Sequence, residues 1–160
     1  MLSCMEAPLK VVFAFLASFG AAFFAYLFVN PELLDWYASL TKPPFAPSET
    51  MLAVVWLIVY GAMATALAIA WTKDPRPEHI EGWVRFFFVQ LLFNAAFMLF
   101  LLAQHAVLIA FVDLLFLGFI VLSLAASAGE IDRRTVYLML AYLLWILYNG
   151  YLTVGIWLLN

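Results

Sequence analysis

Charged residues are scarce in this chain of 160 residues: Lys and Arg total 7, Asp and Glu total 10, and together they make up 11% of the sequence. A water-soluble domain of this size carries charge on roughly a quarter of its residues, because charged side chains cover its surface. The few basic residues also form no stripe that could neutralise a row of phosphates. The composition therefore excludes a soluble globular domain and predicts no nucleic-acid partner.

Cysteine and histidine are nearly absent as well. The single cysteine, Cys4, permits neither a disulfide framework nor a cysteine metal cage. His79 stands among charged residues and His105 between two apolar runs, so both favour solvent-facing positions over metal or haem ligation. The chain also has no nucleophile motif, phosphate-binding loop or pair of catalytic carboxylates. We therefore predict no catalytic residue, no metal site and no required cofactor.

Hydrophobic residues, by contrast, make up 68% of the chain. They form five long apolar runs, each close to the ~20 residues that cross ~30 Å of hydrocarbon as a helix. The runs are Val11 to Val29, Met51 to Trp71, Phe86 to Ala103, Ala106 to Ala128, and Thr135 to Leu159. The sequence thus predicts an all-α membrane protein in which residues 1–160 form one domain, a bundle of five transmembrane helices.

The segments between the runs carry the turn signals. All seven prolines lie outside the runs, and only Gln104 and His105 separate the third run from the fourth. One helix through both runs would be too long for a bilayer, so a tight turn is expected at these two residues. The first run is long, has only Lys10 as a basic flank and precedes further apolar runs, which favours a mature anchor over a signal peptide.

Basic residues near the ends of the runs predict the orientation of the chain. One side collects six of them and the other side has only Lys42; the six are Lys10, Lys73, Arg76, Arg85, Arg133 and Arg134. By the positive-inside rule the N-terminus faces the cytoplasm and the C-terminus the opposite side, in a bacterial cell membrane or an organelle membrane such as the mitochondrial one. The long first loop, residues 30–50, then faces outward, where it forms either a lid over the bundle or a plain solvated linker.

Polar residues inside the runs are the candidates for function. Asp113 is the only formally charged residue there. An unpaired polar group in hydrocarbon costs several kcal/mol, so Asp113 must face protein, water or a ligand. A hydrogen bond to a neighbouring helix and a direct functional role both satisfy that requirement.

Other polar and aromatic residues form stripes at helical spacing. The stripes are Gln90, Asn94 and Phe97 in the third run, Tyr142, Trp145, Asn149 and Thr153 in the fifth, and Trp56 with Tyr60 in the second. If the stripes converge, they line an intramembrane pocket with aromatic walls and a few amide and hydroxyl groups, which suits a planar amphipathic ligand. Aromatic belts at the membrane interfaces and interhelical hydrogen bonds explain the same pattern equally well.

Small residues recur every four positions in the first two runs, at Ala17, Ala21 and Ala25 and at Ala62, Ala66 and Ala70. Small side chains let helix backbones approach closely in a membrane. The alanines therefore indicate either a packing seam inside the bundle or a face for a second copy of the chain.

Several motifs, taken together in their order along the chain, resemble the signature of the translocator protein or tryptophan-rich sensory protein (TspO/MBR) family. The motifs are Trp36-Tyr37, Leu40, Lys42-Pro43, Pro47, Trp56 and Tyr60, then Gln90-Leu91 and Asn94, Val112-Asp113-Leu114-Leu115, and Tyr142, Trp145 and Trp157. The resemblance covers nearly the whole chain.

The resemblance implies a five-helix bundle embedded in lipid, commonly a homodimer or bound to another membrane protein, whose first loop closes over a pocket. It implies that the pocket binds a planar hydrophobic molecule, such as a porphyrin, haem or a sterol-like lipid, in a sensory, regulatory or transport role. An enzymatic activity, the breakdown of a bound porphyrin, is implied by the resemblance alone and by no residue pattern in the sequence. Together with the stripes, the resemblance makes these the candidate ligand-binding residues: Trp36, Pro43, Trp56, Tyr60, Gln90, Asn94, Phe97, Asp113, Tyr142, Trp145 and Asn149.

The chain also departs from the family pattern. Phe45 stands where Trp is usual after Lys-Pro-x, residues 95–98 (Ala-Ala-Phe-Met) replace a Trp-x-Trp-Pro pattern, Ala141 replaces a proline, and Asn149 replaces a small residue. These departures support a second hypothesis, in which the protein is an accessory subunit of a larger membrane complex that keeps the fold while its pocket is filled.

Overall fold

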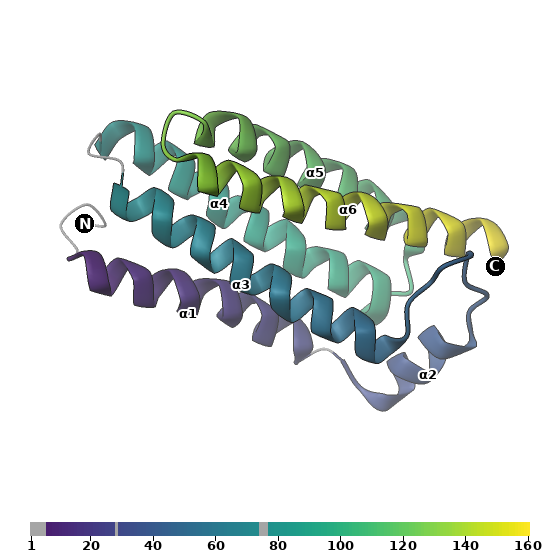
Figure 1. The fold of residues 1–160 in the computed structure, drawn as a ribbon. Coiled ribbons are helices and arrows are strands. Elements are labelled where there is room, and N and C mark those ends of the chain that lie inside the picture. The colour runs from purple at the N-terminus through teal and green to yellow at the C-terminus, as the bar shows by residue number, and fades with distance from the viewer. Residues whose placement is uncertain (1–5, 28, 74–76) are drawn as a thin grey trace.

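The computed structural model describes residues 6–27, 29–73 and 77–160, which form a bundle of long helices without a strand (Figure 1). In chain order the elements are α1 (Ala7–Tyr26), α2 (Pro31–Ser39), α3 (Glu49–Lys73), α4 (Pro77–Met98), the π-helix η2 (Leu99–Ala103), α5 (Val107–Ala128) and α6 (Arg133–Leu159). Within these described ranges, five helices are long and apolar enough to cross a membrane. The prediction of an all-α bundle with five spans is therefore confirmed.

Two helices begin well before the predicted boundaries. α1 begins at Ala7 and ends at Tyr26, and α4 begins at Pro77, nine residues ahead of the predicted start at Phe86. Proline is tolerated in the first turn of a helix, because the N–H group that it lacks would have no partner there. A helix can also extend beyond the hydrocarbon, which the apolar run alone does not reveal. α3, α5 and α6 lie within two residues of the predicted bounds, while residue 28 of the first run and Arg76 lie outside the described residues.

The junction between α4 and α5 contains the expected tight turn. Gln104 donates its backbone N–H to the carbonyl of Leu99 at 3.1 Å, and Ala106 donates to Phe100 at 2.8 Å, so the helix widens before it ends. His105 then adopts a φ of 51°, in the left-handed region that sharply reverses the chain.

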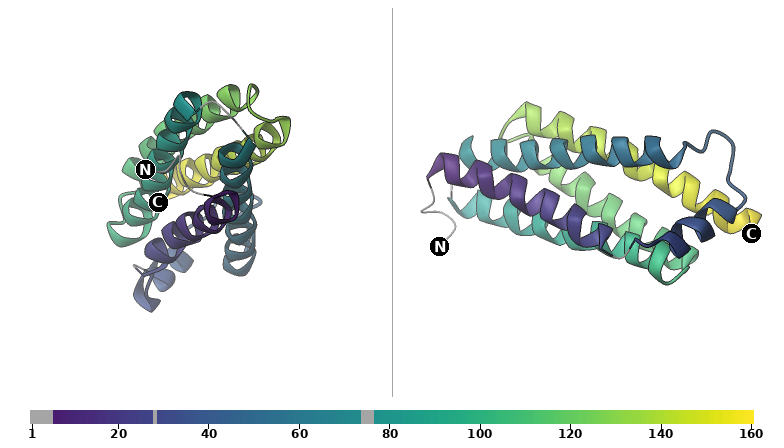
Figure 2. Two further views of the ribbon diagram at one scale, coloured as in Figure 1. Left: turned by 90° about the vertical axis from the view of Figure 1, so that its left-hand side faces the viewer. Right: turned by 90° about the horizontal axis from the view of Figure 1, so that it is seen from below.

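The five spans pack around one core, with α1 along one side of the bundle beside α3 and α4 (Figure 2). Ala66 and Ala70 of α3 are fully buried and Ala25 of α1 is nearly so. Because α1 packs chiefly on α3, these small residues serve contacts within one chain. A homodimer remains a prediction.

The two ends of the bundle differ. α1 begins at one end, while the first loop, which contains α2, lies at the other end together with the end of α6 (Figure 1). At the opposite end to α2, the Lys73 ammonium lies 2.6 Å from an Asp132 carboxylate oxygen and so joins the end of α3 to the turn between α5 and α6. The other Asp132 oxygen accepts from the backbone N–H of Arg134 at 2.8 Å and caps α6.

The substitution Asp132→Asn tests this ion pair through its pH dependence. The hydrogen bond from Lys73, followed by the one from Arg134, lowers the pKa of Asp132 below its ordinary value of 3.8. A carboxyl whose pKa is lowered in the folded state stabilises the fold at neutral pH and loses that contribution as the pH falls through the lowered pKa. We expect the variant to melt at a lower temperature than wild type at pH 7, and the difference to shrink below pH 3.8. A difference that is constant with pH would contradict the ion-pair origin.

Candidate ligand-binding site

The first loop is attached to the last turns of α6. The Asn160 side chain accepts from the Thr41 backbone N–H and donates to the Thr41 carbonyl, each at 3.0 Å, so that the two groups form a closed amide pair. This pair joins residues that are 119 positions apart in the sequence.

Two tyrosine hydroxyls of α6 reinforce the attachment. Tyr148 donates to the carbonyl of Phe45 at 2.8 Å and Tyr151 donates to the carbonyl of Pro44 at 2.9 Å. Phe45 has a φ of 63°, in a region that few residues other than glycine adopt, and its ring is 90% exposed. The hydrogen bonds thus stabilise a turn whose local conformation is unfavourable.

Gly155 of α6 provides the surface on which Pro43 rests. Pro43 is buried, and a Cβ atom added at Gly155 would lie 2.6 Å from both Cβ and Cγ of the proline ring. Only glycine permits this close approach.

α2 is held from its other side. Asn30 caps the helix by accepting from the Leu33 N–H at 2.9 Å, and Pro31 follows in the first turn. The Trp36 ring stacks on His105 in the turn between α4 and α5, with 3.9 Å between ring centroids and 12° between planes. α2 is therefore positioned between that turn and the end of α6.

A cavity of about 690 Å³ lies at this end of the bundle. Its walls come from α1, α2, α3, α6 and the junction of α4 with η2, and are mostly apolar. The lining side chains include Phe19, Ala22, Phe23, Tyr26, Tyr37, Glu49, Trp56, Leu57, Tyr60, Phe97, Met98, Asn149 and Thr153.

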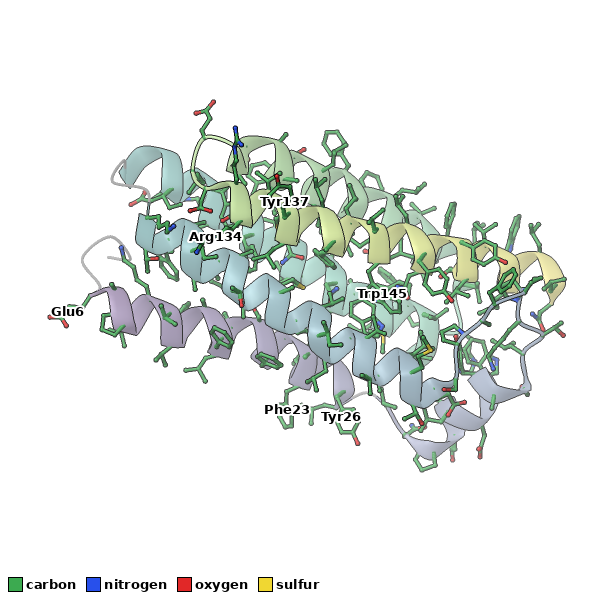
Figure 3. All side chains as sticks on the ribbon, in the orientation of Figure 1. Glu6, Phe23, Tyr26, Arg134, Tyr137 and Trp145 are labelled. Atoms are coloured by element: carbon green, nitrogen blue, oxygen red, sulfur yellow. The ribbon has the colours of Figure 1, made fainter. Side chains whose placement is uncertain are left out.

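The cavity reaches the outer surface of the bundle between α1 and α3. Phe23 and Tyr26 at the end of α1 are 63% and 68% exposed, and Leu57 of α3 is 61% exposed. Phe23 and Tyr26 project away from the bundle (Figure 3). Both helices are candidate membrane spans, so the exposed apolar side chains on this side are expected to meet acyl chains.

A buried hydrogen-bond network stands behind the inner wall. The Tyr60 hydroxyl donates to the Asn94 side-chain oxygen, Asn94 Nδ2 donates to the Tyr142 hydroxyl at 2.9 Å, and Tyr142 donates to Gln90 Oε1 at 3.0 Å. All four side chains are buried, and Tyr60 also lines the cavity. The network therefore joins α3, α4 and α6 and fixes the orientation of the Tyr60 ring.

Trp145 lies beside Trp56 and away from this cavity. The two indole rings meet edge-on with centroids 5.8 Å apart, and Trp145 also stacks on Tyr148 at 5.4 Å. Trp145 borders a second hollow of about 220 Å³ with Pro47, Met51, Val55 and Tyr148. Figure 3 places Trp145 on α6 at the side of the bundle where α3 passes. Its contribution to the larger cavity is to support Trp56.

Apart from Trp145, the predicted site residues thus occupy four kinds of position. Trp56, Tyr60, Phe97 and Asn149 line the cavity; Gln90, Asn94 and Tyr142 form the network behind Tyr60; and Trp36 and Pro43 belong to α2 and the first loop. Asp113 is only 6% exposed and is not among the residues that line the cavity.

Sequence reasoning missed the contribution of α1, and in α2 it selected Trp36 and not Tyr37 as a site residue. Phe19, Ala22 and Tyr26 line the cavity, as does Tyr37. α1 is apolar on all its faces, so no polar stripe indicated which side would meet a cavity. Burial, and after it the charge of Glu49, raise the pKa of Tyr37 above its ordinary value of 10.0.

Comparisons with known proteins agree with this architecture. A family model described as the TspO/MBR family matches residues 12–158. The chain is 31% identical to the uncharacterized membrane protein YtaB of Bacillus subtilis over 140 residues, which cover 86% of this chain and 85% of that protein. It is 25% identical to the tryptophan-rich protein TspO of Bacillus cereus over 93% of this chain and 95% of that protein. It is 30% identical to the translocator protein of Bos taurus over 92% of this chain and 87% of that protein.

Proposed function

The chain belongs to the TspO/MBR family, and from that premise we propose that it is an integral membrane ligand-binding protein. The ligand is a planar, largely apolar molecule, a tetrapyrrole or a sterol-like lipid, and it occupies the cavity beside Trp56. Binding serves a sensory, regulatory or transport role.

The cavity is the observation that carries this proposal. Its volume of about 690 Å³ falls within the roughly 300–1,000 Å³ of typical small-molecule sites. Trp56, Tyr60 and Phe97 offer flat aromatic surfaces, and Asn149 and Thr153 add a few polar atoms. Affinity for a ligand taken from water then comes chiefly from the apolar surface removed from water, at about 25 cal/mol per Å².

The accessory-subunit hypothesis expects the pocket to be filled by side chains. Met98 and Asn149, two of the departures from the family pattern, border the cavity and leave it open. The cavity supports the ligand-binding function over the accessory role.

The substitution Ala22→Phe tests the proposal by filling the cavity. Ala22 lines it from α1, so a phenyl group there occupies space that the ligand needs. We expect affinity for a porphyrin dimethyl ester or a sterol to fall about tenfold or more, which corresponds to about 1.4 kcal/mol. Binding is measured for protein in nanodiscs by quenching of indole fluorescence, with empty nanodiscs subtracted.

Ala141→Phe is the matched control, because Ala141 is exposed on α6 and does not line the cavity. It should bind both probes as wild type does. Equal affinities in the two variants, or no binding by wild type, would contradict the proposed function.

A further inference from the structure

Three polar side chains of the inner wall use most of their hydrogen-bond donors within the protein. The Tyr60 hydroxyl donates to Asn94, the Thr153 hydroxyl donates to the Asn149 carbonyl at 2.7 Å, and Asn149 Nδ2 donates to the Trp145 carbonyl at 2.8 Å. A hydroxyl has one donor and an amide group two, so one N–H of Asn149 remains. The lone pairs of the hydroxyl and amide oxygens also remain, so these three side chains offer the cavity more acceptors than donors.

The mouth of the cavity is acidic. Glu49 is the only charged residue among the described residues that line it, and its side chain is exposed in the first turn of α3. A helix N-terminus is a favourable position for a negatively charged side chain. Its charge also contributes to the raised pKa of Tyr37 across the mouth, after the larger effect of burial.

No base offsets this charge within the cavity wall as far as the structure describes it. Lys42 is not among the lining residues, and its ammonium lies over the Tyr37 ring, 4.7 Å from the centroid. α2 carries two further exposed acids, Glu32 and Asp35, which are not among the residues that line the cavity. A carboxylate carried into the mouth would therefore meet negative charge, whereas an ammonium, N–H or O–H group would meet an acceptor.

We propose that Glu49 is a specificity-determining residue, which selects apolar ligands that carry an amine or hydroxyl at one end and disfavours ligands that carry free carboxylates. This inference rests on the proposed function and names the class of ligand that the same cavity takes. The apolar body lies against Trp56 and Tyr60, and its polar end points toward Glu49.

Three probes that share the same porphyrin ring separate the effect of ligand charge from that of ligand shape. They are the dicarboxylate, its neutral dimethyl ester, and a diamide whose two side chains end in amines. Wild type, Glu49→Gln and Glu49→Lys are titrated with each probe in zwitterionic nanodiscs at low and high salt. Glu32→Gln is the matched control, because it removes an exposed acid of α2 that does not line the cavity. Thermal melting confirms that each variant is folded.

We expect wild type to prefer the amine probe over the dicarboxylate by about tenfold at low salt, and less at high salt because exposed charges are screened. Glu49→Gln should bring the ratio close to one, Glu49→Lys should reverse it, and Glu32→Gln should leave it close to the wild-type value. The ester should bind about equally in all four proteins. If all probes bind but Glu49→Gln keeps the wild-type ratio, the role of Glu49 is overturned while the proposed function stands. If wild type binds no probe, the proposed function fails and the inference fails with it.

Discussion

Gly155→Ala is expected to release the first loop from the end of α6. The added methyl group would lie 2.6 Å from two carbon atoms of Pro43, and a proline ring cannot rotate away as a flexible side chain can. Thr41, two residues before Pro43, forms the amide pair with Asn160 just after the end of α6, so moving Pro43 also strains those two hydrogen bonds. Loss of such hydrogen bonds, at about 1 kcal/mol each, should raise hydrogen exchange of residues 40–46 by about tenfold.

Gly150→Ala is the matched control on the same helix. A Cβ at Gly150 would lie 3.8 Å from the Phe111 ring, which is an ordinary contact. Both substitutions gain helix propensity of about 1 kcal/mol, so the difference between them isolates the clash with Pro43. Exchange measured by mass spectrometry should be raised in residues 40–46 of Gly155→Ala alone. Equal exchange in the two variants would show that the loop does not depend on this contact.

Asn94→Leu is expected to destabilise the bundle strongly. Asn94 is fully buried and bonds the hydroxyls of both Tyr60 and Tyr142. Leucine leaves the Tyr60 donor without its acceptor and removes the hydrogen bond that Tyr142 accepts, inside a span where no water replaces them. Leaving buried groups unpaired costs about 1–3 kcal/mol each, and interhelical hydrogen bonds in membranes lie at the low end, so the expected loss is about 2 kcal/mol.

Asn149→Leu provides the comparison for that loss. The Asn149 side chain donates only to the Trp145 carbonyl of its own helix, so its removal breaks no hydrogen bond between helices. Reversible unfolding in mixed micelles should show a loss of less than about 1 kcal/mol for this variant. If Asn94→Leu costs no more than Asn149→Leu, the network does not hold α3, α4 and α6 together.

Hydropathy predicted the five spans because a bilayer requires each crossing segment to satisfy its backbone hydrogen bonds internally, which a long apolar helix does. The turn at Gln104 and His105 followed from the same length limit. The starts of α1 and α4 were less predictable, since a helix that leaves the hydrocarbon loses the apolar signal but keeps its backbone hydrogen bonds. Pro77, at the start of α4, was in hindsight the available indicator.

The sequence also singled out Gln90, Asn94 and Tyr142, because hydrocarbon does not tolerate an unpaired polar group. It left open whether these residues face a ligand or one another. In the structure they bond one another, and Tyr60 alone joins the network to the cavity.

The class of protein, the number of spans and the residues that must avoid lipid could all be predicted from the sequence, because each depends only on the residues of one helix at a time. The tertiary structure alone decided that α1 forms a cavity wall, that Trp145 supports Trp56 from the side, and that Gly155 seats Pro43. The reason is geometric. Periodicity gives the direction of a side chain about its own helix axis, whereas a cavity depends on the rotation and spacing of helices relative to one another.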